Sequence, residues 1–266
     1  MKAVVMTAPA VDRSTTSVAG IDEPRPGPGQ VAIDVAYAGV NFIDVMARRG
    51  DPGYASAWPY VPGLEIAGTV RSVGSGVRDL HVGARVAAFT PGGGLAEVAV
   101  AAAAAEVTVE VPQEVPLGTA APLVVSTALL LLLTDRARIR PGESVLMHSA
   151  SGGIGSVVSQ VAAALGSGRR IGTVGRPDKI AAGLAAGWDE VFAREAGLAE
   201  AVRPVAPDGW TSSWTLSARP CWIWTCRSRH PAGGSSCSAM PLAALRRRSR
   251  RPAASSAVTQ ACSGSA

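Results

Sequence analysis

The sequence predicts an α/β plus β fold class, in which a β-rich domain precedes a truncated, doubly wound parallel α/β domain. Short β-like stretches broken by Gly and Pro fill the first part, and after Pro112 the hydrophobic period changes to strands that alternate with helices. A hydrophobic content of 47% with 17% charged residues excludes a disordered polymer. We therefore place the first domain at residues 1–116, the partial α/β domain at 117–209, and a separate segment at 210–266.

The first domain is predicted from four β-like stretches and one helix. The stretches begin at Val31, Glu65, Ala84 and Leu95. The helix is predicted at Phe42–Arg49, where Gly50 and the turn residues after it stop the helical pattern.

The second domain is predicted to open with a buried helix over 117–138. Three short apolar stretches then alternate with three helical ones, which is typical of a parallel sheet. The predicted strands are Val145–His148, Ile171–Val174 and Glu190–Phe192, and the predicted helices are Ser156–Leu165, Lys179–Ala186 and Gly197–Val202.

Residues 210–266 have a different composition from the rest of the chain. They contain eight Arg and no acidic residue, together with all four Cys and four of the six Trp. Residues 1–209 instead carry 17 Lys and Arg against 20 acids, so the basic character belongs to the last segment alone. Self-repelling arginines and clusters of Ser, Pro and Gly predict a disordered tail, and its cysteine spacing matches no zinc or redox motif.

Membrane insertion and secretion are not expected. The longest nearly apolar run, Gly118–Leu133, falls short of the roughly 20 residues that span a bilayer. The N-terminus has too short an apolar stretch for a signal peptide, so we expect a cytoplasmic protein.

A glycine-rich turn, SASGGIG at Ser149–Gly155, lies between a predicted strand and a predicted helix. Glycines there let the backbone approach a pyrophosphate, whose charge the free N–H groups of the helix N-terminus then hold. The predicted cofactor contacts are Ser151, Gly152, Gly153, Ile154 and Gly155. The alternative is an ordinary glycine-rich turn between a strand and a helix, because the pattern departs from strict GxGxxG.

The end of the next predicted strand carries cations where NAD enzymes place an acid. Arg176 and Lys179 lie about 20 residues after the glycines. Because a guanidinium matches a 2′-phosphate, the sequence predicts NADPH as the cofactor. The alternative is that both are solvated residues at a helix start.

Four segments together resemble the medium-chain dehydrogenase/reductase superfamily: GVNFIDVMARRG at Gly39, PGLEIAGTV at Pro62, GARV at Gly83 and HSASGGIG at His148. Within it, the zinc-independent quinone oxidoreductase branch, similar to zeta-crystallin, fits best over residues 1–209. The resemblance implies a GroES-like domain followed by a Rossmann domain. It also implies a homodimer that reduces a quinone or an α,β-unsaturated carbonyl by hydride transfer from NADPH.

The resemblance implies that the amide of Asn41 polarises the substrate oxygen, with Asp44 one helical turn further on. Both residue types are also common helix N-caps, so a structural role stays open. Tyr54 is a candidate phenolic donor or a packing residue, and Thr127 is a candidate cofactor contact.

No metal site is expected, because zinc members of this superfamily need thiolate and imidazole ligands in the first domain. No cysteine precedes Cys221, and Leu64 stands where a PGHE pattern has histidine.

The sequence after Gly209 departs from the family pattern. Synonymous codons can be chosen for Trp210–Ser217 that, read one base earlier, encode VDVVLDPV. The segment around Cys221–Met240 can be read in the same register as LDLDLSVAPPGGRLVLFGN, and both resemble the family. We hypothesise a single-base frameshift near Gly209. The incomplete sheet argues against activity, and a non-catalytic nucleotide-binding remnant or interaction protein is the alternative.

Nucleic-acid binding through RRRSRR at Arg246–Arg251 is a weaker hypothesis, because no aromatic residues interleave with these arginines.

Overall fold

The computed structural model describes residues 1–55, 57–127, 139–195 and 198–205, and the backbone of 212–218, 221–227 and 236–241. The chain divides into two compact units, Met1–Ala128 and Leu129–Ala266. Their common boundary lies after Ala128, whereas the sequence analysis set the domain boundary after residue 116. The sequence-predicted class, a β-rich domain followed by an α/β domain, is confirmed.

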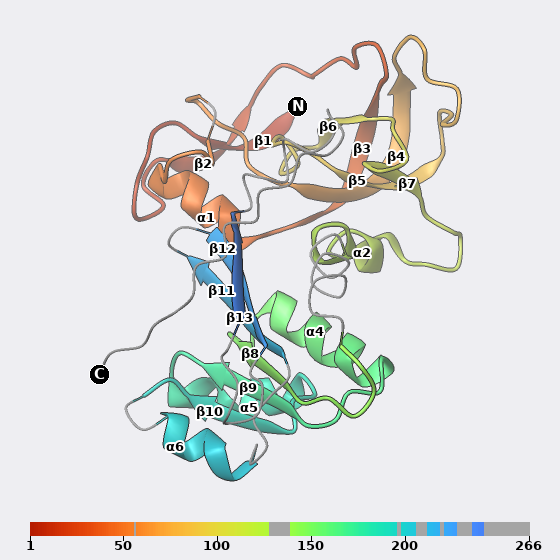
Figure 1. The fold of residues 1–266 in the computed structure, drawn as a ribbon. Coiled ribbons are helices and arrows are strands. Elements are labelled where there is room, and N and C mark those ends of the chain that lie inside the picture. The colour runs from red at the N-terminus through yellow and green to blue at the C-terminus, as the bar shows by residue number, and fades with distance from the viewer. Residues whose placement is uncertain are drawn as a thin grey trace. The chain divides into compact units, whose positions relative to one another are not determined.

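The first unit contains a five-stranded antiparallel sheet of order β6-β3-β4-β5-β7 and a two-stranded sheet, β1-β2 (Figure 1). Four of these strands correspond to the predicted stretches, and the sequence analysis did not predict β1, β2 or β7. The strands are β1 Lys2–Met6, β2 Thr16–Gly20, β3 Gln30–Gly39, β4 Glu65–Val73, β5 Arg85–Phe89, β6 Val98–Ala102 and β7 Thr108–Glu110.

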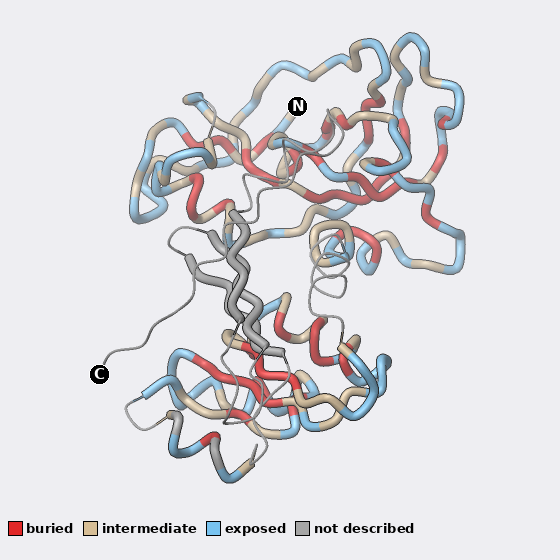
Figure 2. The backbone as a smooth tube through the Cα atoms, in the orientation of Figure 1, coloured by how far each residue is buried: buried red, intermediate tan, exposed pale blue. Residues whose placement is uncertain are grey.

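The inner face of the larger sheet forms the core of this unit (Figure 2). Neighbouring strands contribute β-branched residues that pack on a pleated surface and leave water completely or almost completely. Its most buried members are Val31, Ile33, Ile66, Val70 and Val86.

Helix α1 spans Phe42–Arg49, as predicted, between β3 and β4. Asn41 occupies its N-cap, and Gly50 ends it in the left-handed conformation, with φ of 75°. The helix buries Asp44, Met46 and Ala47, so a carboxylate near its start lies inside the unit. The predicted helix over 117–138 is instead a short α2, Leu117–Ala120, and a helical stretch at 123–127, while 128–138 lie outside the described residues.

The second unit holds a mixed sheet of order β10-β9-β8-β11-β12-β13. The predicted strands and helices are confirmed to within a few residues, and β8, β9 and β10 are parallel. The strands are β8 Val145–His148, β9 Arg170–Val174 and β10 Glu190–Ala193, and the helices are α4 Gly153–Ala164, α5 Ile180–Ala185 and α6 Leu198–Val202, with 3₁₀ turns η1 Pro177–Lys179 and η2 Arg203–Val205.

The core of the second unit lies under the glycine-rich turn. Val145, Met147, Val158 and Trp188 pack in one buried cluster. The Trp188 Nε1–H donates to the carbonyl oxygen of Ala150 at 3.1 Å, so a buried hydrogen bond ties this core to the turn.

Three strands lie in the segment for which the sequence analysis predicted disorder. They are β11 Ser212–Ala218, β12 Cys221–Arg227 and β13 Ser236–Pro241. Strand β11 runs parallel to β8, and β12 and β13 follow as antiparallel neighbours. The prediction of disorder therefore differs from the structure at these strands, because β11 pairs with the edge that β8 would otherwise leave open. The run Arg246–Arg251 lies outside the described residues.

Within the described part of the chain, no helix is both long and apolar enough to cross a membrane.

Candidate functional site

The glycine-rich turn joins β8 to α4 in the second unit. Gly152 is the N-cap of α4, and no side chain caps this helix start. The first N–H groups of a helix have no partner within it, so those of Gly153, Ile154 and Gly155 are available to an anion. Gly152 and Gly153 are exposed, and a Cβ added at Gly153 would meet no atom within 4 Å. The turn therefore has open space at a helix N-terminus.

The same turn is tightly packed on its inner side. Gly155 is buried, and a Cβ there would lie 2.5 Å from the Ser149 carbonyl oxygen and 2.6 Å from that of Ala150. Ser149 adopts a left-handed conformation with φ of 62°, which is uncommon for a residue other than glycine. Gly155 is needed for packing, whereas the exposed Gly152 and Gly153 leave room for a ligand. Ser151 lies half-buried between these two regions.

The two predicted phosphate-binding cations lie at the end of β9. The Arg176 guanidinium forms two hydrogen bonds with Asp178, from Nε to Oδ1 at 3.1 Å and from Nη2 to Oδ2 at 2.9 Å. Both side chains are more than 60% exposed, so solvent screens this ion pair and a phosphate can compete for the guanidinium. Lys179 is exposed at the start of α5.

A further cation, not predicted from the sequence, lies at this edge of the sheet. Arg194 follows β10, and a Cβ on Gly175 would lie 3.3 Å from its Nη2. The backbone N–H of Arg194 donates to the Val174 carbonyl oxygen at 2.8 Å, which holds this residue beside the end of β9. In the sequence, Arg194 is a basic residue two positions after the predicted strand Glu190–Phe192.

His148, at the end of β8, contacts β9 through its ring. Its Nδ1 lies 2.7 Å from the Thr173 Oγ1, and Thr173 is fully buried. Burial, and to a lesser extent the charge of Arg194, lower the pKa of His148. A neutral imidazole that bonds two strands fits a packing role.

In the first unit, Asp44 accepts two backbone hydrogen bonds. Its Oδ2 accepts from the N–H of Asn41 at 2.7 Å, and its Oδ1 from the N–H of Gly63 at 3.0 Å. Burial raises the pKa of Asp44, and the two N–H donors oppose that rise. Asp44 is 6% exposed, so it organises the backbone around Asn41 and presents little surface to a ligand.

The side chain of Asn41 has a partner that the sequence analysis did not predict. The Asn41 Nδ2 donates to the Glu65 Oε1 at 2.8 Å, and the Val125 N–H donates to the Glu65 Oε2 at 2.8 Å. Glu65 begins β4 and is 3% exposed. In the sequence, Glu65 is the acidic residue of the segment PGLEIAGTV, and this was the feature that could have pointed to it.

The two remaining candidates are Tyr54 and Thr127. Tyr54 is half-buried in the loop after α1, and its N–H donates to the Asp51 carbonyl oxygen at 3.4 Å. Thr127 is exposed and follows Val125 by two residues. The structure therefore brings Asn41, Asp44 and Glu65 together. Thr127 lies two residues after Val125, whose N–H donates to Glu65.

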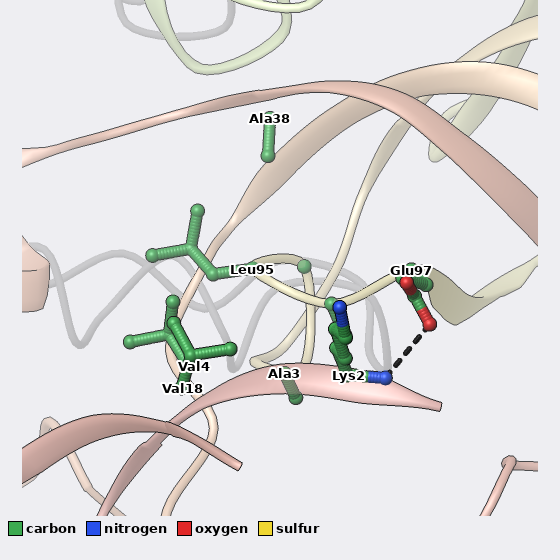
Figure 3. A pocket seen from close by; sticks show the side chains of 9 residues that line it. Lys2, Ala3, Val4, Val18, Ala38, Leu95 and Glu97 are labelled. Atoms are coloured by element: carbon green, nitrogen blue, oxygen red, sulfur yellow. Dashed lines mark hydrogen bonds between the residues drawn. The ribbon is translucent and has the colours of Figure 1, made fainter. Parts of the chain in front are cut away.

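A shallow apolar hollow of about 300 Å³ lies elsewhere in the first unit, between β1, β2, β3 and residues 94–97 (Figure 3). At its rim the Lys2 N–H donates to the Glu97 Oε2 at 2.7 Å. None of the candidate residues lines this hollow. Among the described residues, no group of three or more His, Cys, Asp or Glu is placed to hold a metal ion.

Comparison with known proteins shows the family to which this chain belongs. Residues 27–113 match the Alcohol dehydrogenase GroES-like domain. A probable oxidoreductase from Mycobacterium abscessus is 30% identical, with a TM-score of 0.71 over 80% of this chain and 68% of that one. The chain belongs to the medium-chain dehydrogenase/reductase superfamily.

Within the superfamily, the chain is similar to quinone oxidoreductases. The Quinone oxidoreductase of Rattus norvegicus is 38% identical over 189 residues, which are 70% of this chain and 56% of the rat protein. The Escherichia coli quinone oxidoreductase, solved in complex with NADPH, is 28% identical with a TM-score of 0.71, over 78% of this chain and 63% of that one. The chain thus spans about half the length of the curated relatives it matches.

Proposed function

We propose that this chain is an NADPH-dependent reductase of quinones or other α,β-unsaturated carbonyl compounds. The observation that carries the proposal is the start of α4, which no side chain caps, with open space at Gly153 beside the end of a parallel strand. This arrangement fits a pyrophosphate. The quinone oxidoreductase of E. coli, a relative with the same fold, was solved with NADPH.

The residues present fit the cofactor in two places. Gly152, Gly153 and the N–H groups at the start of α4 would hold its pyrophosphate, and Arg176, Lys179 and Arg194 supply positive charge at the ends of β9 and β10. The cofactor, when bound, supplies a hydride to an electron-poor acceptor.

The chain contributes hydrogen bonding at the substrate. The Asn41 amide keeps one N–H after its bond to Glu65, and we assign this N–H to the carbonyl oxygen of the substrate. Asp44 fixes the backbone of Asn41, so the amide needs little rearrangement when charge develops on that oxygen. The family resemblance further suggests a homodimer.

The test of the proposed function is oxidation of NADPH by the purified full chain in the presence of a quinone and a chelator. We expect turnover that Asn41→Ala lowers by roughly 100-fold. Binding of NADPH with no turnover of any quinone or enone would favour the second candidate, a non-catalytic nucleotide-binding protein. The departure of the sequence from the family pattern after Gly209 favours that candidate.

Cofactor preference gives a separate prediction, because Asp178 competes with a 2′-phosphate for Arg176. We expect Asp178→Ala to tighten NADPH binding by about 2- to 5-fold, in keeping with an exposed ion pair of at most about 1 kcal/mol. NADH binding should change little. We expect Arg176→Ala to reduce the ratio of NADPH to NADH affinity.

Both cofactors are titrated by nicotinamide fluorescence, with Asp79→Ala as the control at an exposed aspartate of the first unit. Equal effects of Asp178→Ala on both cofactors would contradict the assignment of Arg176.

A further inference from the structure

We propose that Glu65 is a positioning residue, which fixes the orientation of the Asn41 side-chain amide by holding Nδ2 against its carboxylate. The inference rests on the proposed function, because the amide it orients is the group assigned to the substrate oxygen. Glu65 itself is buried behind Asn41 and acts through it.

The hydrogen bonds of Glu65 determine which way the amide faces. A carboxylate only accepts hydrogen bonds, and one as buried as Glu65 persists only where donors satisfy it. Asn41 Nδ2 and the Val125 N–H are those donors, each at 2.8 Å from a different oxygen. The nitrogen of the Asn41 amide must therefore face Glu65. The second N–H and Oδ1 of Asn41 then have fixed directions.

The strand next to Glu65 leaves space for this carboxylate. Gly39 pairs with Glu65 in the register of β3 and β4, and a Cβ on Gly39 would overlap the Glu65 side chain. The φ of Gly39 is outside the positive range, so its backbone does not require glycine. Room for the carboxylate is the remaining physical reason for glycine here.

The backbone N–H and the side-chain nitrogen of Asn41 donate to different carboxylates. Asp44 accepts the backbone N–H of Asn41, and Glu65 accepts its side-chain Nδ2. The Asn41 side chain also takes part in the capping box of α1, where it accepts from the N–H of Asp44. A change at Glu65 therefore leaves the bond from the Asn41 backbone to Asp44 in place, and it acts on the Asn41 amide and on the Val125 N–H. This separation makes the role of Glu65 measurable.

The first experiment is Glu65→Gln in the full chain, followed by ¹⁵N NMR of the Asn41 side-chain amide. The Val125 N–H requires an acceptor, so the Gln oxygen takes that place and its NH₂ group faces Asn41. Asn41 must then turn its amide over and accept with Oδ1. We expect the Asn41 N–H that donates to the carboxylate to move upfield. Glu110→Gln, at an exposed glutamate of β7, should not move it.

An Asn41 signal unchanged by Glu65→Gln would overturn the proposal. Should Glu65→Gln fail to fold, Gly39→Ala gives the same readout, because its Cβ displaces the carboxylate without changing its charge. An unchanged Asn41 signal in a folded Gly39→Ala variant would equally overturn the proposal.

The second experiment is a double-mutant cycle on turnover. We expect Asn41→Ala to lower kcat by roughly 100-fold and Glu65→Gln by roughly 10- to 100-fold, with the KM for NADPH unchanged. The double variant should be no slower than Asn41→Ala, because Glu65 acts through Asn41. Multiplicative losses would show a separate structural role and overturn the proposal. If the unaltered chain turns over no quinone, the proposed function fails, and the NMR result alone decides the role of Glu65.

Discussion

Replacing Asp44 with Ala is expected to lower the local stability of the first unit by roughly 2–4 kcal/mol, because two backbone donors lose their acceptor. The Asn41 and Gly63 N–H groups donate to separate oxygens of this buried carboxylate. An unsatisfied buried donor costs about 1–3 kcal/mol, and Ala leaves both unsatisfied. Water can reach neither oxygen position easily, because Asp44 is 6% exposed.

Amide hydrogen exchange of α1 and of residues 61–65 measures this loss, since it reports the free energy of local opening. Asp79→Ala removes an exposed aspartate in the same unit, and we expect it to change the opening free energy by no more than about 0.5 kcal/mol. The amides of β8, in the other unit, should keep their protection in both variants. Equal exchange in the two aspartate variants would show that Asp44 does not hold this backbone.

The elements that could be predicted from the sequence are those with local signals. Helix α1 ends where Gly50 supplies a left-handed residue, and β8 is a short apolar run bounded by turn residues. The glycine-rich turn was recognised because glycine spacing, a strand and a helix are all adjacent in the chain. Strand β2 was missed because most of its residues are exposed, so no hydrophobic alternation marks it.

The contacts around Asn41 could not be predicted, because they join distant residues. Glu65 lies 24 residues from Asn41 and 60 from Val125 along the chain. Only the folding of β3 against β4, with Gly39 opposite Glu65, brings the carboxylate to the amide. The strands after residue 211 were missed for a related reason. These strands form through pairing of β11 with β8, which lies much earlier in the sequence. The composition of residues 210–266, taken alone, favoured disorder.

Substitutions at two glycines of one turn are expected to have opposite effects on stability, although both lower the affinity for NADPH. In Gly155→Ala, the Cβ meets backbone carbonyl oxygens of Ser149 and Ala150 at 2.5 Å and 2.6 Å, so the turn itself must move. We expect a stability loss of about 1–3 kcal/mol, as for other overpacked sites. We also expect at least a roughly 10-fold loss of NADPH affinity, because the N–H groups at the start of α4 leave their positions.

In Gly153→Ala, the Cβ meets no atom within 4 Å and the residue lies in the first turn of α4. Alanine should therefore stabilise the folded chain by about 0.4–1 kcal/mol, since it restricts the unfolded state. The methyl group nevertheless occupies the open space where a pyrophosphate would approach the helix, so we expect a roughly 10-fold loss of NADPH affinity. Nicotinamide fluorescence measures the affinity, and hydrogen exchange of α4 measures the stability. Gly20→Ala is the matched control in the first unit, where a Cβ also meets nothing within 4 Å. Unchanged NADPH affinity in Gly153→Ala would contradict phosphate binding at the start of α4, and it would remove the observation on which the proposed function depends.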